Sequence, residues 1–205
     1  MAATSVAPRA LGPSGQRIGL LGGSFNPAHD GHRDVSLVAL VRLHLDRVWW
    51  LVSPQSPLKP TTGMAPLEER LAAGRKVARH PRIVVTDLER RLGTVYTADT
   101  LAELKRRFPR VRFVWLMGAD ALAELPRWHD WPAIFAAMPV AIFDRAPYAQ
   151  QALAGKAARR FARWRLGAWE APRLADLAPP AWVFLHGRCH PASGTALRAA
   201  SRGRA

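Results

Sequence analysis

The sequence is poor in cysteine and in long apolar runs. Its 205 residues include one cysteine, Cys189, so no disulfide can form within the chain, which suits a reducing compartment. No apolar run reaches the roughly 20 residues of a membrane-spanning helix, because prolines, arginines and glycines interrupt each one. Residues 1–16 lack the apolar segment of a secretory signal. We therefore expect a cytoplasmic protein with no membrane partner.

Acidic residues are also scarce. The chain has 15 of them against 30 basic residues, which gives a net charge of +15. A charge of this size favours nucleic-acid binding. The arginines are however dispersed over the predicted helices, and no recognised nucleic-acid-binding module is present. Because the same positive field attracts any anionic substrate, the charge alone does not predict a nucleic-acid partner.

Length and hydrophobic patterning predict one domain. With 49% hydrophobic residues the chain can bury a substantial core. We assign residues 17–205 to this domain and residues 1–16 to a disordered extension. Short apolar strands are expected over residues 17–21, 47–52, 82–86, 111–117, 139–143 and 181–185.

Helical patterns separate these strands. They cover residues 35–45, 66–79, 98–108 and 148–165, with a closing helix from about residue 195. The proline-rich residues 167–180 are expected to form an irregular loop. Alternating strands and helices give right-handed crossovers. The predicted fold is therefore α/β, a single Rossmann-like, doubly wound parallel sheet with helices on both faces.

A glycine-rich turn follows the first strand. The strand runs into Gly22 and Gly23, whose missing side chains let backbone amides approach a ligand. Asn26 precedes Pro27 and therefore avoids the helical conformation. Asp30 stands where the N-cap of the next helix belongs. The amino end of that helix, with its free N–H groups, is expected to face the same cleft.

Two histidines, His29 and His32, frame this helix start. An imidazole offers N–H donors to phosphoryl oxygens, and a protonated imidazole adds charge where negative charge develops in a transition state. Zinc is the alternative, but a zinc site needs three or four protein ligands, and the sequence has no cysteine cluster or second histidine pair to supply them. We therefore interpret the stretch as a nucleotide phosphate site and predict no protein-bound metal.

This stretch reads Gly22-Gly23-Ser24-Phe25-Asn26-Pro27-Ala28-His29-Asp30-Gly31-His32. It closely resembles the signature of the bacterial nicotinate-nucleotide adenylyltransferases, which belong to the His-x-Gly-His nucleotidyltransferase superfamily. The resemblance implies transfer of the adenylyl group of ATP to nicotinate mononucleotide, which gives deamido-NAD and pyrophosphate in NAD biosynthesis. It also implies contacts with ATP from Gly22, Gly23, Ser24, Phe25, His29 and His32, catalytic roles for the two histidines, and a contact of Asn26 with nicotinate mononucleotide. Mg²⁺ is expected to arrive with ATP, because it is held mainly by phosphates and waters.

A second motif near the carboxyl end supports the resemblance. The family pattern Ile-Ser-Ser-Thr followed by x-x-Arg matches Ser193, Thr195 and Arg198, whereas Ala192 and Gly194 depart from it. Ser193 and Thr195 supply hydroxyls at a helix start, and Arg198 lies on the same helix face as Thr195. The resemblance assigns all three to ATP, with Arg198 acting on the leaving pyrophosphate.

Lys59 lies in a proline-rich loop after the second strand. It matches the lysine of the family pattern Pro-His-Lys, but Leu58 replaces the histidine. The resemblance gives Lys59 a catalytic role and a contact with nicotinate mononucleotide. A solvated loop lysine is the alternative, since isolated lysines are normally exposed.

Other positions are implied to bind the two nucleotides. Thr97, in a segment that resembles the family's Tyr-Thr-x-Asp-Thr-Leu, is expected to cap a helix and bind the nicotinate carboxylate, although capping alone explains its residue type. Trp128 is implied to stack on the pyridine ring, with the backbone amide of His129 at the carboxylate. Arg145 matches an arginine of the nicotinate mononucleotide site, and Asp120 is implied to accept ribose hydroxyls of ATP.

Two rival functions stay open. A related transferase would act on nicotinamide mononucleotide or phosphopantetheine, although Trp128, His129 and the Thr97 segment favour nicotinate. The rival from another class is a basic nucleic-acid-binding protein whose nucleotide site has decayed. The sequence does not predict the oligomeric state, and residues 148–180 match no motif.

Overall fold

The structure is a computed structural model that describes residues 15–54 and 63–187. Within these residues, seven strands form one sheet in the order β3-β2-β1-β4-β5-β7-β6. They are β1 (Arg17–Gly23), β2 (Arg47–Val52), β3 (Ile83–Thr86), β4 (Arg112–Gly118), β5 (Val140–Phe143), β6 (Arg165–Leu166) and β7 (Trp182–Leu185). Every pairing in the sheet is parallel, which confirms the predicted doubly wound α/β fold.

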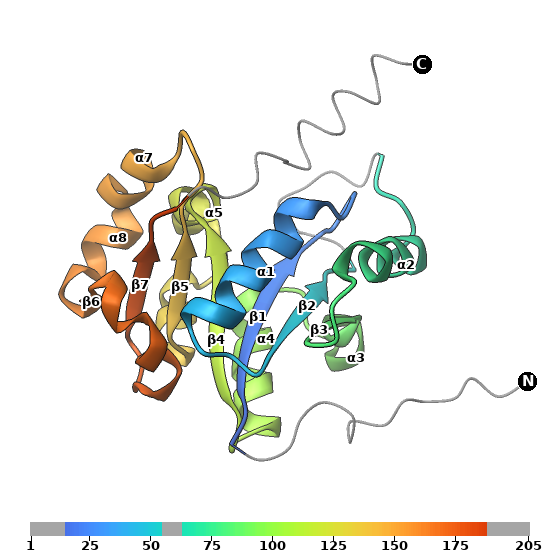
Figure 1. The fold of residues 1–205 in the computed structure, drawn as a ribbon, viewed down its shortest axis with the longest axis horizontal. Helices are drawn as coiled ribbons and strands as arrows, with labels where there is room; N and C mark the ends of the chain where they lie inside the picture. The colour runs from blue at the N-terminus through green and yellow to red at the C-terminus, as the bar shows by residue number, and fades with distance from the viewer. Residues whose placement is uncertain (1–14, 55–62, 188–205) are drawn as a thin grey trace, which may run out of the picture.

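Alternate residues of every strand except the short β6 pack into two hydrophobic clusters, one on each face of the sheet. In β1, for example, Ile18 and Leu20 face one cluster and Leu21 faces the other. Burial on both faces explains why the strands are apolar throughout. Figure 1 shows α1 in front of the sheet and α4 behind it.

The helices divide between the two faces. The cluster that contains Leu21 also holds residues of three helices: α1 (Asp30–Arg42), α2 (Leu67–Ala78) and the 3-10 helix η4 (Ala168–Asp176). The other cluster holds residues of α3 (Leu88–Leu92), α4 (Thr97–Arg107), α5 (Ala119–Glu124), η2 (Leu125–Arg127), α6 (Trp131–Ala137), α7 (Ala149–Ala154) and α8 (Lys156–Arg160). The sheet is therefore covered on both faces, as expected for parallel strands.

The strand order places a reversal at the centre of the sheet. The chain runs outward from β1 through β2 to β3, and then restarts at β4 on the other side of β1. In open α/β sheets, ligands bind beyond the carboxyl ends of the strands at such a switch point. The turn after β1 and the turn after β4 therefore flank the expected cleft.

The chain after β5 differs from the prediction. Instead of one helix over residues 148–165, it forms α7, α8 and a 3-10 turn, η3 (Ala162–Trp164). Gly155 separates α7 from α8 in an extended conformation, with φ −71° and ψ 165°. Glycine is a poor helix former, so the helical pattern is interrupted there.

The predicted loop over residues 167–180 is also wrong in part, because η4 covers most of it. Ala171, Leu174 and Ala175 are buried against the sheet, and this packing orders a segment that its prolines made look irregular. The short helix α3 was not predicted, and it ends at Gly93, whose φ is 68°. The expected closing helix lies outside the described residues.

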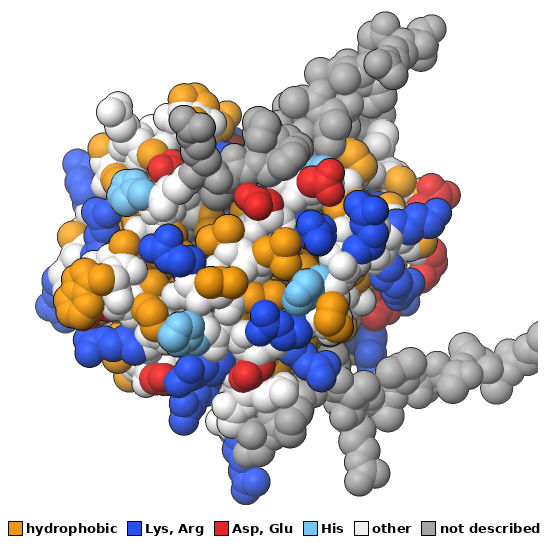
Figure 2. Space-filling model, in the orientation of Figure 1, with side chains coloured by type: hydrophobic (Ala, Val, Ile, Leu, Met, Phe, Trp, Pro, Cys, Tyr) orange, Lys and Arg blue, Asp and Glu red, His pale blue; other side chains and the backbone are white. Residues whose placement is uncertain are grey.

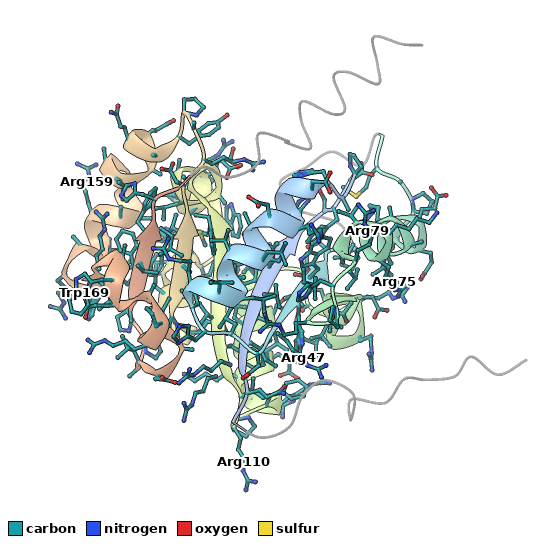
Figure 3. All side chains as sticks on the ribbon, viewed as in Figure 1. Arg47, Arg75, Arg79, Arg110, Arg159 and Trp169 are labelled. Carbon is teal, nitrogen blue, oxygen red and sulfur yellow. The ribbon has the colours of Figure 1, made fainter. Side chains whose placement is uncertain are left out.

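Basic side chains are spread over the surface. On the face that carries α1, Figure 2 shows Lys and Arg dispersed rather than gathered in one patch. Figure 3 shows arginines extending from separate parts of the molecule, namely Arg47, Arg75, Arg79, Arg110 and Arg159. In the part of the chain that the structure describes, the helices are too short or too polar to cross a bilayer.

Candidate functional site

Gly22 lies where β1 meets β4. A Cβ at this position would approach Cη2 of Trp115 to within 2.4 Å, which is closer than carbon atoms can pack. Trp115 is buried in the core and has no room to move aside. At Gly23 the nearest neighbour of a Cβ would be the Phe25 ring at 3.6 Å, an ordinary contact. Packing therefore explains the glycine at position 22, whereas the one at position 23 is available to serve a ligand.

Phe25 turns the chain after the glycines. Its φ is 48°, a left-handed conformation that is uncommon for a bulky side chain. The ring is buried, stacks on Trp50 with a centroid distance of 5.0 Å, and lies 4.6 Å from the ring of His32. Core packing of the side chain therefore holds the turn and supports the imidazole of His32.

His29 and His32 lie side by side at the start of α1, with ring centroids 3.8 Å apart. The backbone N–H of His29 donates to Nδ1 of His32 at 3.2 Å. Because Nδ1 is the acceptor, a neutral His32 carries its proton on Nε2, so Nε2–H is its donor. His29, not Asp30, is the N-cap, which corrects the prediction. Asp30 is the first helical residue, where its carboxylate still complements the helix dipole.

A buried hydrogen-bond chain connects this helix start to the sheet. The Ser36 hydroxyl donates to the carbonyl oxygen of His32 at 2.8 Å. The indole Nε1–H of Trp50, in β2, donates to the Ser36 oxygen at 2.8 Å. Ser36 and Trp50 are fully buried. The orientation of His32 is therefore fixed relative to β2 by both packing and hydrogen bonds.

Asp120 follows β4 on the other side of the switch point. Nη1 of Arg145 donates to Oδ2 of Asp120 at 2.7 Å, and both side chains are about one-third exposed. A Cβ at Gly118 would lie 2.3 Å from Oδ1 of Asp120, so the glycine lets the carboxylate fold over the end of β4. A carboxylate has about four lone-pair sites, and one ion pair therefore leaves capacity for hydroxyl donors.

The start of α4 lies beside the segment that follows η2. The ring of Tyr96 packs on the ring of His129 with a centroid distance of 4.2 Å. Trp128 is half-buried against the cluster that includes Leu101 of α4. Tyr96, not Thr97, is the N-cap of α4, which corrects the prediction; Thr97 is the first helical residue. Thr97 and Trp128 are therefore brought to one region of the molecule.

Two buried charged residues lie near the ends of β1 and β2. The Arg70 side chain donates to backbone carbonyl oxygens, two of which belong to Ser24 and Ser53. Burial raises the pKa of the Glu89 carboxyl from 4.5 to about 7, and a hydrogen bond with Ser53 partly opposes that rise.

Across residues 15–54 and 63–187, no group of three or more His, Cys, Asp or Glu could hold a metal ion.

The chain is similar to known proteins over most of its length. The cytidylyltransferase-like family model matches residues 20–200. The chain is 56% identical over 182 residues to the probable nicotinate-nucleotide adenylyltransferase of Bradyrhizobium sp. strain ORS 278. The aligned region covers 89% of this chain and 95% of that protein. It is 54% identical to the protein of the same description from Gluconacetobacter diazotrophicus, over 90% of this chain and 86% of the relative.

The chain belongs to the nicotinate-nucleotide adenylyltransferase family. Among solved structures it resembles the Plasmodium falciparum nicotinic acid mononucleotide adenylyltransferase complexed with NaAD. The TM-score is 0.67 at 15% identity, over 90% of this chain and 83% of that chain. At this identity the likeness establishes that the two proteins share a fold.

The structure brings several of the predicted adenylyltransferase residues together. Gly22 to His32 form one turn and helix start, Asp120 is paired with Arg145, and Tyr96, next to Thr97, contacts His129. The predicted site residues outside the described part of the chain are Lys59, Ser193, Thr195 and Arg198. The motif near the carboxyl end is thus still known only from the sequence.

Asn26 has partners of its own in the structure. Its Nδ2 donates to the carbonyl oxygen of Gly63 at 3.0 Å, and its Oδ1 accepts from the backbone N–H of Ala65 at 3.1 Å. The Asn26 side chain therefore holds residues 63–65 against residues 22–32, called the signature turn below. This structural role stands beside the predicted contact of Asn26 with nicotinate mononucleotide.

Arg70 and Glu89 were missed by sequence reasoning. A signal for Arg70 existed, because it falls three residues after Leu67 and four before Gly74, on the helix face that packs on the sheet. In a chain with 30 basic residues, one arginine on an apolar face is easily read as a surface residue. Glu89 gave no comparable signal, since the short helix that carries it was itself not predicted.

Proposed function

We propose that this chain transfers the adenylyl group of ATP to nicotinate mononucleotide, giving deamido-NAD and pyrophosphate. The observation that carries the proposal is that the His29–His32 pair follows β1 and the carboxylate of Asp120 follows β4, two strands that are paired in parallel. A phosphate site and a hydroxyl acceptor at one switch point suit a bound nucleotide. Relatives at more than half identity carry the name of this reaction.

The proposed chemistry is an in-line displacement at phosphorus. A 5′-phosphate oxygen of nicotinate mononucleotide attacks the α-phosphorus of ATP. The new P–O bond forms as the bond to the oxygen bridging the α- and β-phosphorus breaks, and pyrophosphate leaves with that electron pair. No covalent enzyme intermediate forms. The protein contributes positioning and stabilisation of the developing charge.

The residues at the end of β1 act on the triphosphate. His29 and His32 donate to the α-phosphate oxygens, where His32 uses its Nε2–H. The backbone amides of Gly22 to Phe25 and the amino end of α1 bind the neighbouring phosphates. Lys59, Ser193, Thr195 and Arg198 are assigned to the phosphates and the leaving pyrophosphate by the family pattern. Mg²⁺ enters as part of the ATP substrate, held mainly by phosphates and waters.

The second nucleotide occupies the region between α4 and the segment after η2. Trp128 stacks on the pyridine ring, while Thr97 and the backbone amide of His129 bind its carboxylate. Asn26 and Arg145 complete this subsite, and Asp120 accepts ribose hydroxyls. The catalytic domain proposed from the sequence, residues 17–205, starts at the first residue of β1, and we place its reaction in the cytoplasm.

A pyrophosphate-release assay tests the function. Purified protein is incubated with ATP, Mg²⁺ and nicotinate mononucleotide, and the pyrophosphate formed is measured together with deamido-NAD. Release that depends on the mononucleotide is expected. A folded protein that produces neither product overturns the assignment.

Parallel reactions with other acceptors separate the rivals. Faster turnover with nicotinamide mononucleotide or phosphopantetheine would move the chain to a related transferase. Salt-dependent DNA binding together with undetectable ATP binding would favour the nucleic-acid alternative.

A further inference from the structure

Arg70, in the first turn of α2, is a buried cation. Its side chain is 3% exposed, although arginine is rarely buried unless its charge and donors are satisfied. Burial lowers the pKa of the guanidinium from its ordinary value. Among the described residues no carboxylate forms an ion pair with Arg70. Hydrogen bonds must therefore compensate for the water that it has lost.

The Arg70 side chain binds four backbone carbonyl oxygens. Nε donates to Ala65 at 2.9 Å, Nη1 to Ser24 and Ser53 at 2.7 Å each, and Nη2 to Pro54 at 2.8 Å. A guanidinium presents five N–H donors in a rigid plane, so it fixes these oxygens relative to one another. A lysine ammonium is a single flexible point charge and cannot reproduce that arrangement.

Two of these acceptors connect the exits of β1 and β2. Ser24 lies in the signature between Gly23 and Phe25, and Ser53 follows directly after β2. The backbone N–H of Ser53 also donates to the carbonyl oxygen of Gly23 at 2.9 Å. Arg70 therefore fastens the two strand ends together just before the chain turns toward His29.

A third acceptor, Ala65, is held from two sides. Asn26 accepts from the Ala65 N–H, and Arg70 donates to the Ala65 carbonyl oxygen. The signature turn, residues 63–65 and the start of α2 thus form one hydrogen-bonded unit. The next residue of the helix, Leu71, is buried in the core and anchors the unit there.

We propose that Arg70 is a positioning residue for adenylyl transfer. Its hydrogen bonds hold the signature turn in the geometry that presents His29 and His32 to the α-phosphate, an inference that rests on the proposed function. A misplacement of about 1 Å at a reacting centre can cost about 100-fold in rate. Loosening this turn therefore lowers kcat more than it weakens substrate binding.

The kinetic test compares Arg70→Lys and Arg70→Ala with Arg75→Ala. Arg75 is an exposed arginine of the same helix, labelled in Figure 3. Circular dichroism and thermal melting first give the folded fraction of each protein. In Arg70→Lys we expect kcat per folded molecule to fall about 10- to 100-fold while the KM for ATP changes less than about threefold. Arg75→Ala should match the wild type.

Chemical rescue adds a readout that a purely structural role would not give. Guanidinium at concentrations far below those that denature should raise the kcat of Arg70→Ala, whereas ammonium and the Arg75→Ala background should show no such gain. A folded Arg70→Lys protein with wild-type kcat overturns the proposal. An activity loss in proportion to the unfolded fraction also overturns the proposal. If Arg70→Ala does not fold, the kcat of Arg70→Lys is the deciding measurement.

Failure of the function and failure of the positioning role give different results. If the wild type and Arg75→Ala both release no pyrophosphate, the proposed reaction has failed. Nitrogen-15 NMR of the imidazoles then tests the positioning separately: in Arg70→Lys the signals of His29 and His32 should shift, while those of His80 stay fixed. Unchanged signals at His29 and His32 overturn the positioning role.

Discussion

Two sets of charged residues, one at each end of the parallel sheet, differ in how deeply they are buried. At the carboxyl end, Arg70 and Glu89 are 3% and 5% exposed, and both bind Ser53, one at its carbonyl oxygen and the other at its side chain. At the amino end, Asp176 pairs with Arg17 and Arg112 through side chains that are 31% to 51% exposed. Buried charges need complete sets of partners and so fix the backbone around them, whereas exposed pairs compete with water and contribute little.

Within residues 15–54 and 63–187, a hollow and the polar groups of the candidate site lie at opposite ends of the sheet. A hollow of about 410 Å³ lies near the amino ends of β4 and β5, bordered by Phe113, Met138 and Asp176. Its wall is mostly apolar. The imidazole pair, the Asp120–Arg145 pair and the start of α1 all gather at the carboxyl end instead. Ligands of open parallel sheets bind beyond the carboxyl ends of the strands, so the proposed site is assigned to the end where these polar groups converge.

The largest effect is expected from His32→Ala at the carboxyl end. Loss of one transition-state donor should lower kcat about 100- to 1000-fold, or about 2.7–4 kcal/mol, in the pyrophosphate assay. His80→Ala is the matched control, because Nδ1 of His80 also accepts a backbone N–H, from Arg82, but lies before β3 at the amino end. A His32→Ala enzyme with normal kcat would remove this residue from the mechanism.

A smaller effect, on stability, is expected from Glu89→Gln. The folded-state pKa of Glu89 is about 7, above the ordinary value of 4.5. Between these values the unfolded chain releases the proton while the folded chain keeps it, so wild-type stability falls as pH rises through this window and the penalty is constant above it. Glutamine stays neutral, so the variant should gain on the wild type by up to about 3 kcal/mol above pH 7.

Denaturant unfolding of both proteins across that pH range measures the difference. The gap between Glu89→Gln and the wild type should open between pH 4.5 and 7 and then stay level. Two curves that run parallel over the whole range would show that Glu89 titrates normally in the folded protein.

The smallest effect is expected from Asp176→Asn at the amino end. The substitution weakens two partly exposed ion pairs, each worth about 0–1 kcal/mol, so the free energy of unfolding should fall by at most about 2 kcal/mol. Added salt should shrink the difference, and kcat should stay at the wild-type value. A fall in kcat would show that Asp176, at the amino end of the sheet, affects the reaction, which would contradict its assignment to stability alone.

Local pattern was sufficient for much of this protein. The apolar runs predicted the strands, because residues buried on both faces of a parallel sheet must be apolar throughout. The stretch from Gly22 to His32 predicts a phosphate site at the end of the first strand, because its residues are contiguous, and this site stays a prediction. The sequence predicted Asp30 and Thr97 as N-caps, each one residue too late. The N-caps are His29 and Tyr96, which adopt the extended cap conformation.

The sequence by itself therefore determined the fold class, the family and the turn that carries the two histidines. Tertiary structure alone decided the strand order that sets β1 beside β4, the pairing of Asp120 with Arg145, and the packing of Tyr96 on His129. It also decided that Arg70 is buried while Arg75 on the same helix is exposed. These contacts join residues that are distant in the chain, and their energies depend on which backbone groups folding brings within hydrogen-bonding distance.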